Sequence, residues 1–333
     1  MARFKAIYSP NFDQIARVEA IIQKWEKGER SFDILSSGST GNPKIITLSK
    51  DLLVWSANAT LKHLDLKPKS ILCCLPVDKT AGFMQLIRAL CWGCEIHFHP
   101  PSQTPLSTPV KNSFSIISLT PNQVEYCIEN QRDNVHKFKH VLIGGAALTQ
   151  PLSYYASLDL PHTNLWFTYG MTETASHIAI QNLSKSEPHL KLLTGVLVET
   201  NADHTEIQIP ELSLSIQVND ILKVHPTGIS ILGRRDHVIN SDGIKIHPDQ
   251  IEPLIQDAFD HLNINRRFYV TKQTSDRYGE IAILVMEETT PVDEQKVLTA
   301  LSNLLPKYHT PKKIRYSKAF EYTDTGKLIR RTY

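Results

Sequence analysis

The sequence predicts an α/β protein with a large amino-terminal α/β domain that includes a β subdomain, followed by a small α+β carboxy-terminal domain. Three observations support this prediction. Apolar, strand-like runs alternate with helix-like runs through the first half of the chain, which is typical of layered α/β domains. Beyond residue 200, short runs of alternating polarity replace the helices. A hairpin, helices and further strands follow this region, which predicts a second, smaller domain.

Composition sets the bounds of what the protein can be. The chain has 333 residues, 41% of them hydrophobic, which suffices for one large and one smaller domain. Its 36 basic side chains nearly balance 34 acidic ones, so neither nucleic acid nor an anionic membrane is expected as a partner. The start lacks the apolar core of a signal peptide, and no apolar run approaches ~18 residues. We therefore expect a cytoplasmic protein without membrane insertion.

The five cysteines predict reduced, buried thiols, because most of them lie in apolar runs. Cys91 and Cys94 have the spacing of half a zinc site or of a redox pair. No second pair and no nearby set of histidines completes such a site.

The elements of the first domain follow from apolar spacing. In chain order they are a helix at 14–28, strands at 32–35 and 45–48, a helix from Ser49, a strand at 71–75, a helix at 81–92, a strand at 95–98, a helix from Thr120, and strands at 141–143 and 165–168. Ser49 is placed as a cap, and Thr120 with Gln123 has the pattern of a capping box. Because ligands of α/β domains bind at strand ends, the residues after 143 and 168 are candidate site residues.

The loop between the strands at 32–35 and 45–48 is rich in small hydrogen-bond donors. Its glycines permit close backbone approach, and its hydroxyl, amide and ammonium groups suit a polyanion such as phosphate. Pro43 separates glycine from lysine, so the loop is not the P-loop of common NTPases. An ordinary polar turn is the alternative. The candidate residues are Ser37, Gly38, Ser39, Thr40, Gly41 and Lys44.

The hexamer from Tyr169 to Thr174 carries a second set of ligand-binding groups. A tyrosine can stack on a purine, the hydroxyl of Thr172 can bond a phosphate oxygen, and Glu173 can hold Mg²⁺. The alternative is a turn with an exposed acid.

A third candidate pair lies beyond residue 200, where Asp220 precedes Arg234 by fourteen residues. A carboxylate accepts from vicinal hydroxyls while a guanidinium donates, which suits a diol. The alternative is a surface salt bridge.

The second domain begins with a hairpin over 237–247, whose two-residue turn is Asp242-Gly243. It continues with a helix over 248–258, strands at 267–271 and 280–286, a helix at about 292–304 and a strand near 313–317.

Five segments resemble, in order and spacing, the motifs of the acyl-adenylate-forming enzymes, the family of acyl-CoA synthetases and adenylation domains. They are the loop at 36–44, the hexamer at 169–174, the pair of Asp220 and Arg234, the hairpin with the start of the helix after it, and Thr323–Arg330 at the end of the chain. The resemblance covers the chain from about residue 30. It implies that Lys327, Glu173, Thr172 and Lys44 are catalytic and that Glu173 binds Mg²⁺. It implies ATP or AMP binding by the loop of 37–41 and by Gly144, Gly145, Ala146, Tyr169, Gly170, Met171, Thr172, Asp220 and Arg234. In that role Asp220 and Arg234 would hold the ribose hydroxyls.

The same resemblance implies a mobile small domain with its hinge at Asp236, which sets the domains at 1–236 and 237–333. It also implies a coenzyme A path bordered by Ser241, Asp242 and Gly243. Asp242 departs from the family, which usually has glycine there. The chain has 35 residues before Ser36, far fewer than family members carry, which implies a truncated N-terminal lobe. A second copy of the chain could cover the apolar surface that such a truncation leaves, so the sequence is compatible with a homo-oligomer as well as with a monomer.

In compactness the chain looks most like the short o-succinylbenzoate–CoA ligases of menaquinone synthesis. The implied reaction uses ATP and Mg²⁺ to form an acyl-adenylate, which coenzyme A then converts to a thioester. Candidates for the acid substrate's second carboxylate are Lys79, Arg88, Ser176 and His177. The alternatives are a ligase or adenylating enzyme for another aryl or acyl acid, and a non-catalytic nucleotide-binding relative.

Overall fold

The computed structural model describes residues 4–36, 44–107, 110–148, 150–201, 204–288, 292–321 and 328–333. The chain divides into two compact units. The first unit comprises Met1–Leu197, Gln208–Ile216 and His225–Ile229, and the second comprises Val198–Ile207, Gln217–Val224 and Ser230–Tyr333. The single domain limit at residue 236 stays a prediction.

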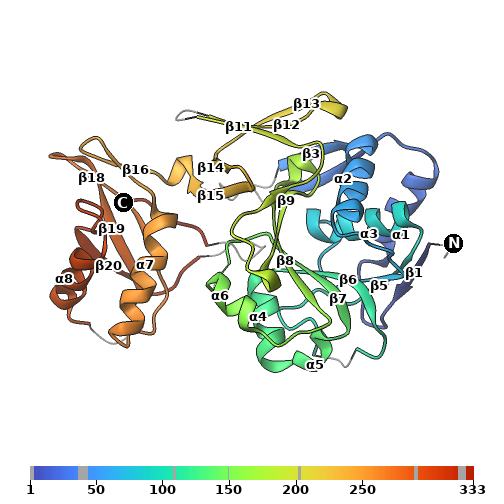
Figure 1. Cartoon of the computed structure of the whole chain (residues 1–333), viewed down its shortest axis with the longest axis horizontal. Coiled ribbons are helices and arrows are strands. Elements are labelled where there is room, and N and C mark those ends of the chain that lie inside the picture. The colour runs from blue at the N-terminus through green and yellow to red at the C-terminus, as the bar shows by residue number, and fades with distance from the viewer. Residues whose placement is uncertain are drawn as a thin grey trace. The chain divides into compact units, whose positions relative to one another are not determined.

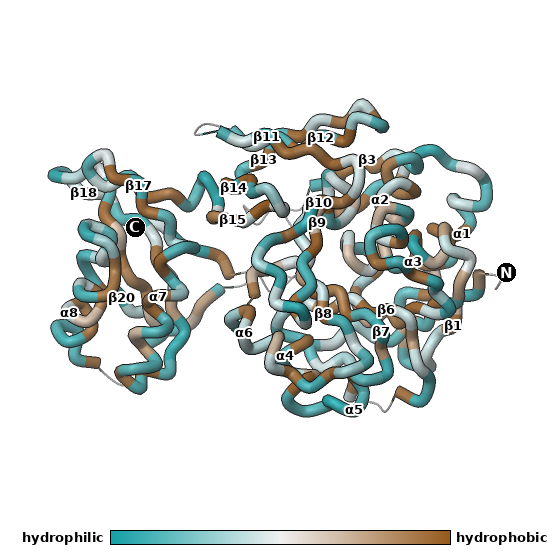
Figure 2. Tube along the Cα trace, viewed as in Figure 1, coloured by the Kyte–Doolittle hydropathy of each residue, from teal (hydrophilic) through white to brown (hydrophobic). Residues whose placement is uncertain are grey.

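The predicted α/β architecture is confirmed by the central sheet of the first unit (Figure 1). Within the described residues its strand order is β1-β5-β4-β6-β7-β8-β9-β10. The strands are β1 (Lys5–Tyr8), β4 (Ser70–Cys73), β5 (Glu95–Phe98), β6 (Phe114–Leu119), β7 (Phe138–Ile143), β8 (Asn164–Gly170), β9 (His177–Asn182) and β10 (Lys191–Leu192). The strands β1, β5, β4, β6, β7 and β8 run parallel, whereas β9 and β10 are antiparallel to their neighbours. The parallel strands are mostly hydrophobic along their length, as Figure 2 shows, because both of their faces are buried.

Helices cover both faces of this sheet. The helices are α1 (Ile15–Glu26), α2 (Lys50–His63), α3 (Thr80–Trp92), α4 (Pro121–Asn130), α5 (Arg132–Val135) and α6 (Leu152–Ser157). The connection from β4 through α3 to β5 runs toward one edge of the sheet, and the connections from β6 to β8 run toward the other. Right-handed crossovers then place α3 opposite α4, as seen in Figure 1. The switch point between β4 and β6 is where ligands of such sheets bind.

The predicted helix starts are confirmed by their hydrogen bonds. Ser49 Oγ accepts the amide hydrogen of Leu52 at 3.2 Å and caps α2. At α4, Thr120 Oγ1 accepts from the amide of Gln123, and the side chain of Gln123 accepts from the amide of Thr120, which completes the capping box.

Several elements were not predicted, among them the strands β1, β6, β9 and β10 and the helices α5 and α6. The first strand pairs with β5, and its Tyr8 stacks with Phe12 and Phe98 at centroid distances of 5.9 and 5.6 Å. This aromatic stack fixes the segment at the edge of the sheet.

Smaller sheets complete the β structure of the first part of the chain. They are the antiparallel pair β2 (Ser31–Ser36) and β3 (Lys44–Ser49), the sheet of β11 (Leu197–Thr200), β12 (Thr205–Ile209) and β13 (Leu214–Val218), and the pair β14 (Asp220–His225) and β15 (Gly228–Arg234). Short 3₁₀ turns lie at η1 (Thr172–Thr174), η2 (Leu183–Lys185), η3 (Pro210–Leu212) and η4 (Arg235–His237).

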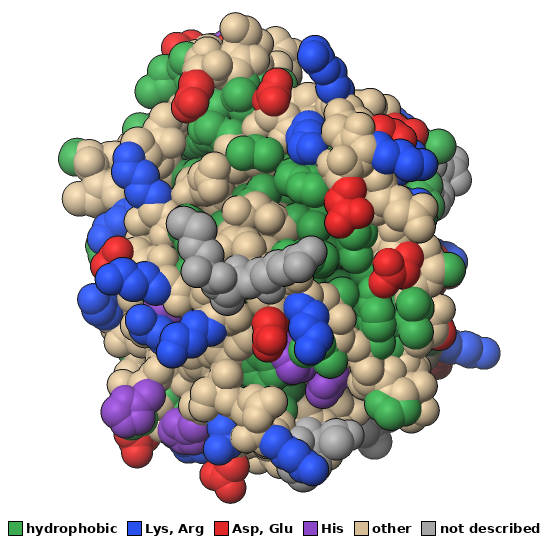
Figure 3. All heavy atoms as spheres, turned by 90° about the vertical axis from the view of Figure 1, so that its right-hand side faces the viewer, with side chains coloured by type: hydrophobic (Ala, Val, Ile, Leu, Met, Phe, Trp, Pro, Cys, Tyr) green, Lys and Arg blue, Asp and Glu red, His purple; other side chains and the backbone are tan. Residues whose placement is uncertain are grey.

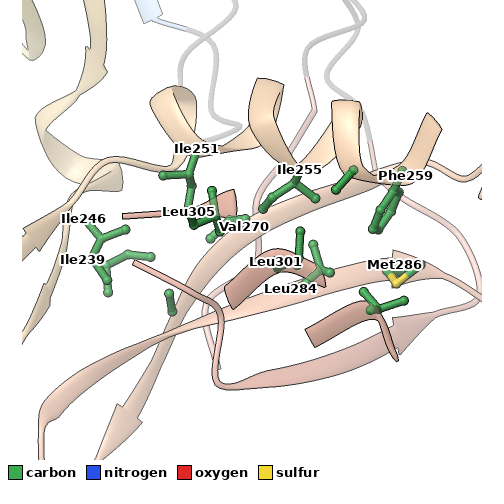
Figure 4. Packing of buried hydrophobic residues seen from close by; sticks show 13 residues of the cluster. Ile239, Ile246, Ile251, Ile255, Phe259, Val270, Leu284, Met286, Leu301 and Leu305 are labelled. Atoms are coloured by element: carbon green, nitrogen blue, oxygen red, sulfur yellow. The ribbon is translucent and has the colours of Figure 1, made fainter. Parts of the chain in front are cut away.

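The second unit has its own core, shown in Figure 4. Its remaining elements are β16 (Ile239–Ser241), β17 (Ile244–Ile246), α7 (Pro248–His261), β18 (Phe268–Ser275), β19 (Gly279–Glu287), α8 (Glu294–Leu304) and β20 (Lys313–Ser317). Ile255 and Phe259 of α7 point toward the sheet and pack with Leu284 of β19 and Leu301 of α8. The strands and helices predicted for this part of the chain are confirmed to within a few residues.

The surface carries mixed charges. On the face seen in Figure 3, lysine, arginine and acidic side chains are interspersed around exposed apolar side chains. No helix in the described ranges is long and apolar enough to cross a membrane.

Candidate active site

The strands that flank the predicted phosphate loop form an antiparallel pair, with Ser36 opposite Lys44. Lys44 opens β3 and is exposed. Ser37, Gly38, Ser39, Thr40 and Gly41 lie outside the described residues. Strand β3 lies next to the turn η1, so the strand that begins with Lys44 runs beside the residues predicted to bind phosphate and metal.

The residues after β8 form a tight turn that presents Thr172 and Glu173. Gly170 is required there because a Cβ atom would lie 2.2 Å from the carbonyl oxygen of Ser176. Thr174 is buried, and its hydroxyl bonds to the amide of Met171 at 3.1 Å and to the carbonyl of Ser176 at 2.7 Å. The buried threonine closes the turn, and the Glu173 side chain is left exposed.

Thr172 contacts a residue that the sequence did not single out. Its Oγ1 lies 2.7 Å from Oγ1 of Thr80, the first residue of α3. Thr80 lies in the segment after β4, close to the switch point of the sheet. The sequence could have pointed to Thr80 because it follows a buried strand, where ligands of α/β domains bind, and lies two residues beyond Asp78.

Gly144, Gly145 and Ala146 follow β7, the strand next to β8. A Cβ on Gly144 would lie 2.3 Å from Oγ1 of Thr168, and Gly145 has a φ of +86°, so both glycines are needed for this turn. Because the two strands are parallel, this turn and the turn at Tyr169 leave the same edge of the sheet. Tyr169 itself is mostly buried, with 8% of its surface exposed.

A buried polar network lies between α2, α3 and the start of β9. Arg88 of α3 is 2% exposed, and its Nη2 donates to Ser176 Oγ at 2.6 Å while Nη1 donates to Gln85 at 3.2 Å. His177 Nδ1 lies 3.3 Å from Ser176 Oγ, and its Nε2 lies 3.0 Å from Thr60 Oγ1. The structure therefore brings three of the acid-substrate candidates together.

The protonation states of this network follow from burial. Burial lowers the pKa of Arg88 to about 10, so the guanidinium remains charged at neutral pH. Burial, and then the nearby charge of Arg88, holds the pKa of His177 well below its usual range. The network therefore combines one cation with a neutral imidazole. Within the described residues no carboxylate pairs with Arg88, and its Nε has no hydrogen-bond partner.

Lys79 is the candidate that the structure does not place in this network. It is the N-cap of α3 and lies nine residues before Arg88. At 1.5 Å per residue the two Cα atoms are about 13 Å apart along the helix axis. Thr60 and Gln85, which do belong to the network, were missed because neutral polar residues on a helix give no distinctive pattern.

The predicted ribose pair comes together in the second unit. Arg234 Nη1 lies 3.4 Å from Asp220 Oδ1, so the ends of β14 and β15 bring the two side chains into contact. Arg234 also donates from Nε and Nη2 to both carboxylate oxygens of Asp236, at 2.9 and 2.8 Å. Partial burial raises the pKa of Asp236, but the hydrogen bonds from Arg234 outweigh it and leave that pKa below its usual value.

The predicted hairpin turn is confirmed at Ser241, Asp242 and Gly243. Ser241 pairs with Ile244, and the two turn residues have φ values of +52° and +81°. Two successive positive φ values are the signature of a type I′ turn, which an Asp-Gly pair favours. Lys327 lies outside the described residues.

A metal would find few preformed ligands here. The described residues contain no group of three histidine, cysteine or acidic side chains that could hold one. Mg²⁺ in nucleotide sites is typically held by one or two carboxylates together with substrate phosphates. An exposed Glu173 with no ion pair among the described residues fits that requirement.

Comparison with known proteins extends these observations. Residues 16–209 match the family model described as AMP-binding enzyme. The chain is 26% identical over 343 residues to the 2-succinylbenzoate–CoA ligase of Listeria monocytogenes, covering 93% of this chain and 71% of that protein.

Two solved structures are similar over most of the chain. An acyl-CoA synthetase (AMP-forming)/AMP-acid ligase II-like protein from Dyadobacter fermentans is 30% identical, with a TM-score of 0.62 over 96% of this chain and 93% of that one. The o-succinylbenzoate coenzyme A synthetase of Bacillus subtilis, solved with ATP and magnesium ion, is 19% identical, with a TM-score of 0.77 over 98% of this chain and 78% of that one. The same Bacillus protein has been solved with the acyl-adenylate OSB-AMP.

Proposed function

The chain belongs to the AMP-binding enzyme family and is an acid–thiol ligase, and we propose that it activates o-succinylbenzoate with ATP and transfers the acyl group to coenzyme A. The carboxylate of the acid attacks the α-phosphorus of ATP, pyrophosphate leaves, and an acyl-adenylate forms. The thiol of coenzyme A then attacks the acyl carbon and AMP leaves. Neither step needs a protein nucleophile, so the residues act by positioning and by stabilising charge.

The first half-reaction uses the turn after β8 and the strand that begins with Lys44. Thr172 offers its hydroxyl to a phosphate oxygen, and Lys44 offers an ammonium group to the same polyanion. Glu173 would hold Mg²⁺, which when bound neutralises charge on the phosphates. Arg234 as donor and Asp220 as acceptor form a pair that suits the ribose hydroxyls. Lys327 is proposed as the cation that offsets charge at the α-phosphate.

The buried charge of Arg88 is the observation that supports a dicarboxylic acid as the substrate. Its guanidinium is 2% exposed and, among the described residues, bonds to the neutral side chains of Gln85 and Ser176. Removing a cation from water without an anion costs several kcal/mol, so an anionic partner is expected in the working complex. A dicarboxylic acid supplies that anion when one carboxylate is activated and the other remains free. o-Succinylbenzoate has this chemistry, with a ring carboxylate beside a succinyl side chain.

The test compares two acids that differ only in the second carboxylate, o-succinylbenzoate and 4-oxo-4-phenylbutanoate. Thioester formation with coenzyme A is measured for the wild type and for Arg88→Met. We expect the wild type to prefer the dicarboxylate, and Arg88→Met to lose on the order of a hundredfold in kcat/KM with it, as for loss of a buried charged partner. The rate with the monocarboxylate should change little.

The exposed Arg132 on α5 provides the matched control, since Arg132→Gln removes a cation that donates to the carbonyl of Asp159. Its rates with both acids should equal those of the wild type. Equal losses with the two acids in Arg88→Met would contradict the assignment of Arg88. Detection of a thioester from another acid, but not from o-succinylbenzoate, would overturn the substrate.

A further inference from the structure

Arg330 joins the end of the chain to helix α7. Its side chain is 15% exposed, and it forks onto Glu252, with Nη1 on Oε1 and Nη2 on Oε2 at 2.7 Å. Nη1 also donates to the carbonyl of Val270 at 3.1 Å, while the amide of Val270 donates to Glu252 Oε1 at 2.6 Å. A bidentate guanidinium–carboxylate pair fixes orientation as well as distance. The tail, α7 and β18 are therefore held together at one point.

The backbone around Arg330 is fixed on both sides. The amide of Ile329 donates to the carbonyl of Glu321 at 2.9 Å, and the amide of Tyr333 donates to the carbonyl of Lys272 at 3.1 Å. Leu328 packs against the buried cluster of Tyr269, Ile281, Ile283 and Val285. The described part of the tail thus lies along the edge of β18, and the residue next after Lys327 in sequence is held in place.

Asp249 connects the same arginine to the predicted hinge. Its Oδ1 lies 3.3 Å from Arg330 Nη2, and its Oδ2 lies 3.8 Å from His237 Nδ1. A Cβ atom on Gly233 would lie 2.6 Å from Asp249 Oδ2, so the carboxylate rests on the backbone there. Asp249 therefore contacts residues on both sides of Asp236, and Arg330 contacts Asp249.

We propose that Arg330 is a positioning residue for adenylation, which acts through Glu252 and Asp249 to hold the chain from residue 328 onward, directly after Lys327 in sequence, against α7 and the residues beside the hinge at Asp236. Burying an ion pair seldom increases stability over an apolar packing, so stability alone does not account for this arrangement. A need for fixed geometry does account for it, because a donor that stabilises charge on a reacting phosphate loses much of its effect on the rate when it is displaced. The proposal rests on the proposed roles of Lys327 and Asp236.

The neighbouring Arg331 provides the matched control. Arg331 pairs with Glu321, which lies in the segment after β20, and the side chain of Arg331 is 63% exposed. Arg331→Gln therefore removes the same charge one residue away without breaking the link to α7.

The experiment measures the two half-reactions separately in the full chain. Pyrophosphate release from o-succinylbenzoate and ATP reports adenylation, and thioester formation from prepared adenylate and coenzyme A reports the second step. We expect Arg330→Gln to slow adenylation on the order of a hundredfold and to leave the second step nearly unchanged, because the charge that Lys327 is proposed to offset builds up at the α-phosphate during adenylation. Arg331→Gln should change neither rate.

Asp249→Asn is the second variant, because it keeps the fork onto Glu252 and removes only the charge that reaches the hinge. It should show the same selectivity with a smaller loss. Hydrogen exchange of the peptide that contains Ile329 gives a readout independent of activity, and it should accelerate in Arg330→Gln but not in Arg331→Gln.

A wild type that forms no adenylate from o-succinylbenzoate overturns the substrate proposal, while the exchange measurement still tests the anchor. Equal slowing of both half-reactions in Arg330→Gln, or unchanged exchange at Ile329, overturns the positioning role. An effect of the same size in Arg331→Gln overturns it as well, because the loss of charge alone would then explain the result.

Discussion

The hydroxyl oxygens of Thr80 and Thr172 lie 2.7 Å apart, and this contact joins the first turn of α3 to the turn after β8. A hydroxyl has one hydrogen to donate, so the bond decides which way each hydroxyl points. If Thr172 donates its hydrogen to Thr80, only lone pairs of the Thr172 hydroxyl remain for other partners. If Thr80 donates instead, Thr172 keeps its hydrogen for a phosphate oxygen. Thr80 therefore controls the donor that the proposed mechanism assigns to Thr172.

The first prediction is that Thr80→Val impairs adenylation and that Thr80→Ser restores it. Valine keeps the shape of the side chain and removes the hydroxyl, which leaves Thr172 free to rotate. Loss of one such bond is worth about 1 kcal/mol, or several-fold in kcat/KM for ATP. Pyrophosphate release at varied ATP measures it. A Thr80→Ser variant as slow as Thr80→Val would show that packing, rather than the hydroxyl, matters.

The second prediction concerns Glu173, whose exposed carboxylate is proposed to hold Mg²⁺. Glu173→Gln should raise the Mg²⁺ concentration needed for half-maximal pyrophosphate release, because an amide is a weaker ligand than a carboxylate. The melting temperature should remain that of the wild type, since an exposed side chain contributes little to packing. Glu129→Gln, at an exposed acid of α4, serves as the control. An unchanged Mg²⁺ requirement in Glu173→Gln would contradict the metal role.

The third prediction is a pH dependence of stability from His140. This histidine is 4% exposed, and its Nδ1 accepts from Trp166 Nε1 at 3.0 Å. Burial lowers its pKa from 6.5 to about 4, and protonating Nδ1 would also break the bond to Trp166. In the unfolded chain the imidazole takes up a proton at higher pH than in the folded chain. Stability from this group is therefore complete above pH 6.5 and falls as the pH drops toward 4.

The size of this effect is at most about 3 kcal/mol, from the difference between the two pKa values. The free energy of unfolding in urea, measured at pH 7 and pH 5, should fall more steeply in the wild type than in His140→Asn. Asparagine can still accept from Trp166 but does not titrate in this range. The other buried histidines contribute equally to both proteins, so the comparison isolates His140. Identical slopes would refute the assignment.

Local chemistry explains why much of the fold could be predicted. The caps at Ser49 and Thr120 and the turn at Asp242-Gly243 depend on residues at most three apart, and all three are confirmed. Strand β1 could not be predicted in the same way, because its four residues are stabilised by pairing with β5, about ninety residues later. Tertiary contacts, rather than propensity, decide such short edge strands.

The candidate site divides along the same line. The turns at Gly144 and at Tyr169 follow predicted strands, and the order of the parallel sheet brings them to one edge. The network of Arg88, Ser176 and Thr60 joins positions that are far apart in sequence, and neutral partners such as Thr60 carry no local signal. The sequence predicts which residues carry charge, whereas the structure decides which of them lose their contact with water.

The last prediction concerns the turn of Asp242 and Gly243, which is proposed to border the path of coenzyme A. Gly243 has a φ of +81°, and a Cβ atom there would meet nothing within 4 Å. A valine at this position therefore carries backbone strain of roughly 1–2 kcal/mol without a clash inside the protein, and it projects into the space beside the turn. If coenzyme A uses that space, Gly243→Val should slow thioester formation from prepared adenylate while adenylation from acid and ATP stays nearly unchanged.

Gly28, with a φ of +77° and equally open space, gives a control with matched strain. Gly28→Val should lower the melting temperature by a similar amount and leave the ratio of the two half-reactions as in the wild type, because it follows α1 in the first unit. Both rates are compared below the melting temperature of the less stable variant, so that strain does not affect the ratio. If Gly243→Val slows both half-reactions alike, or if Gly28→Val shows the same selectivity, the hairpin does not border the thiol path.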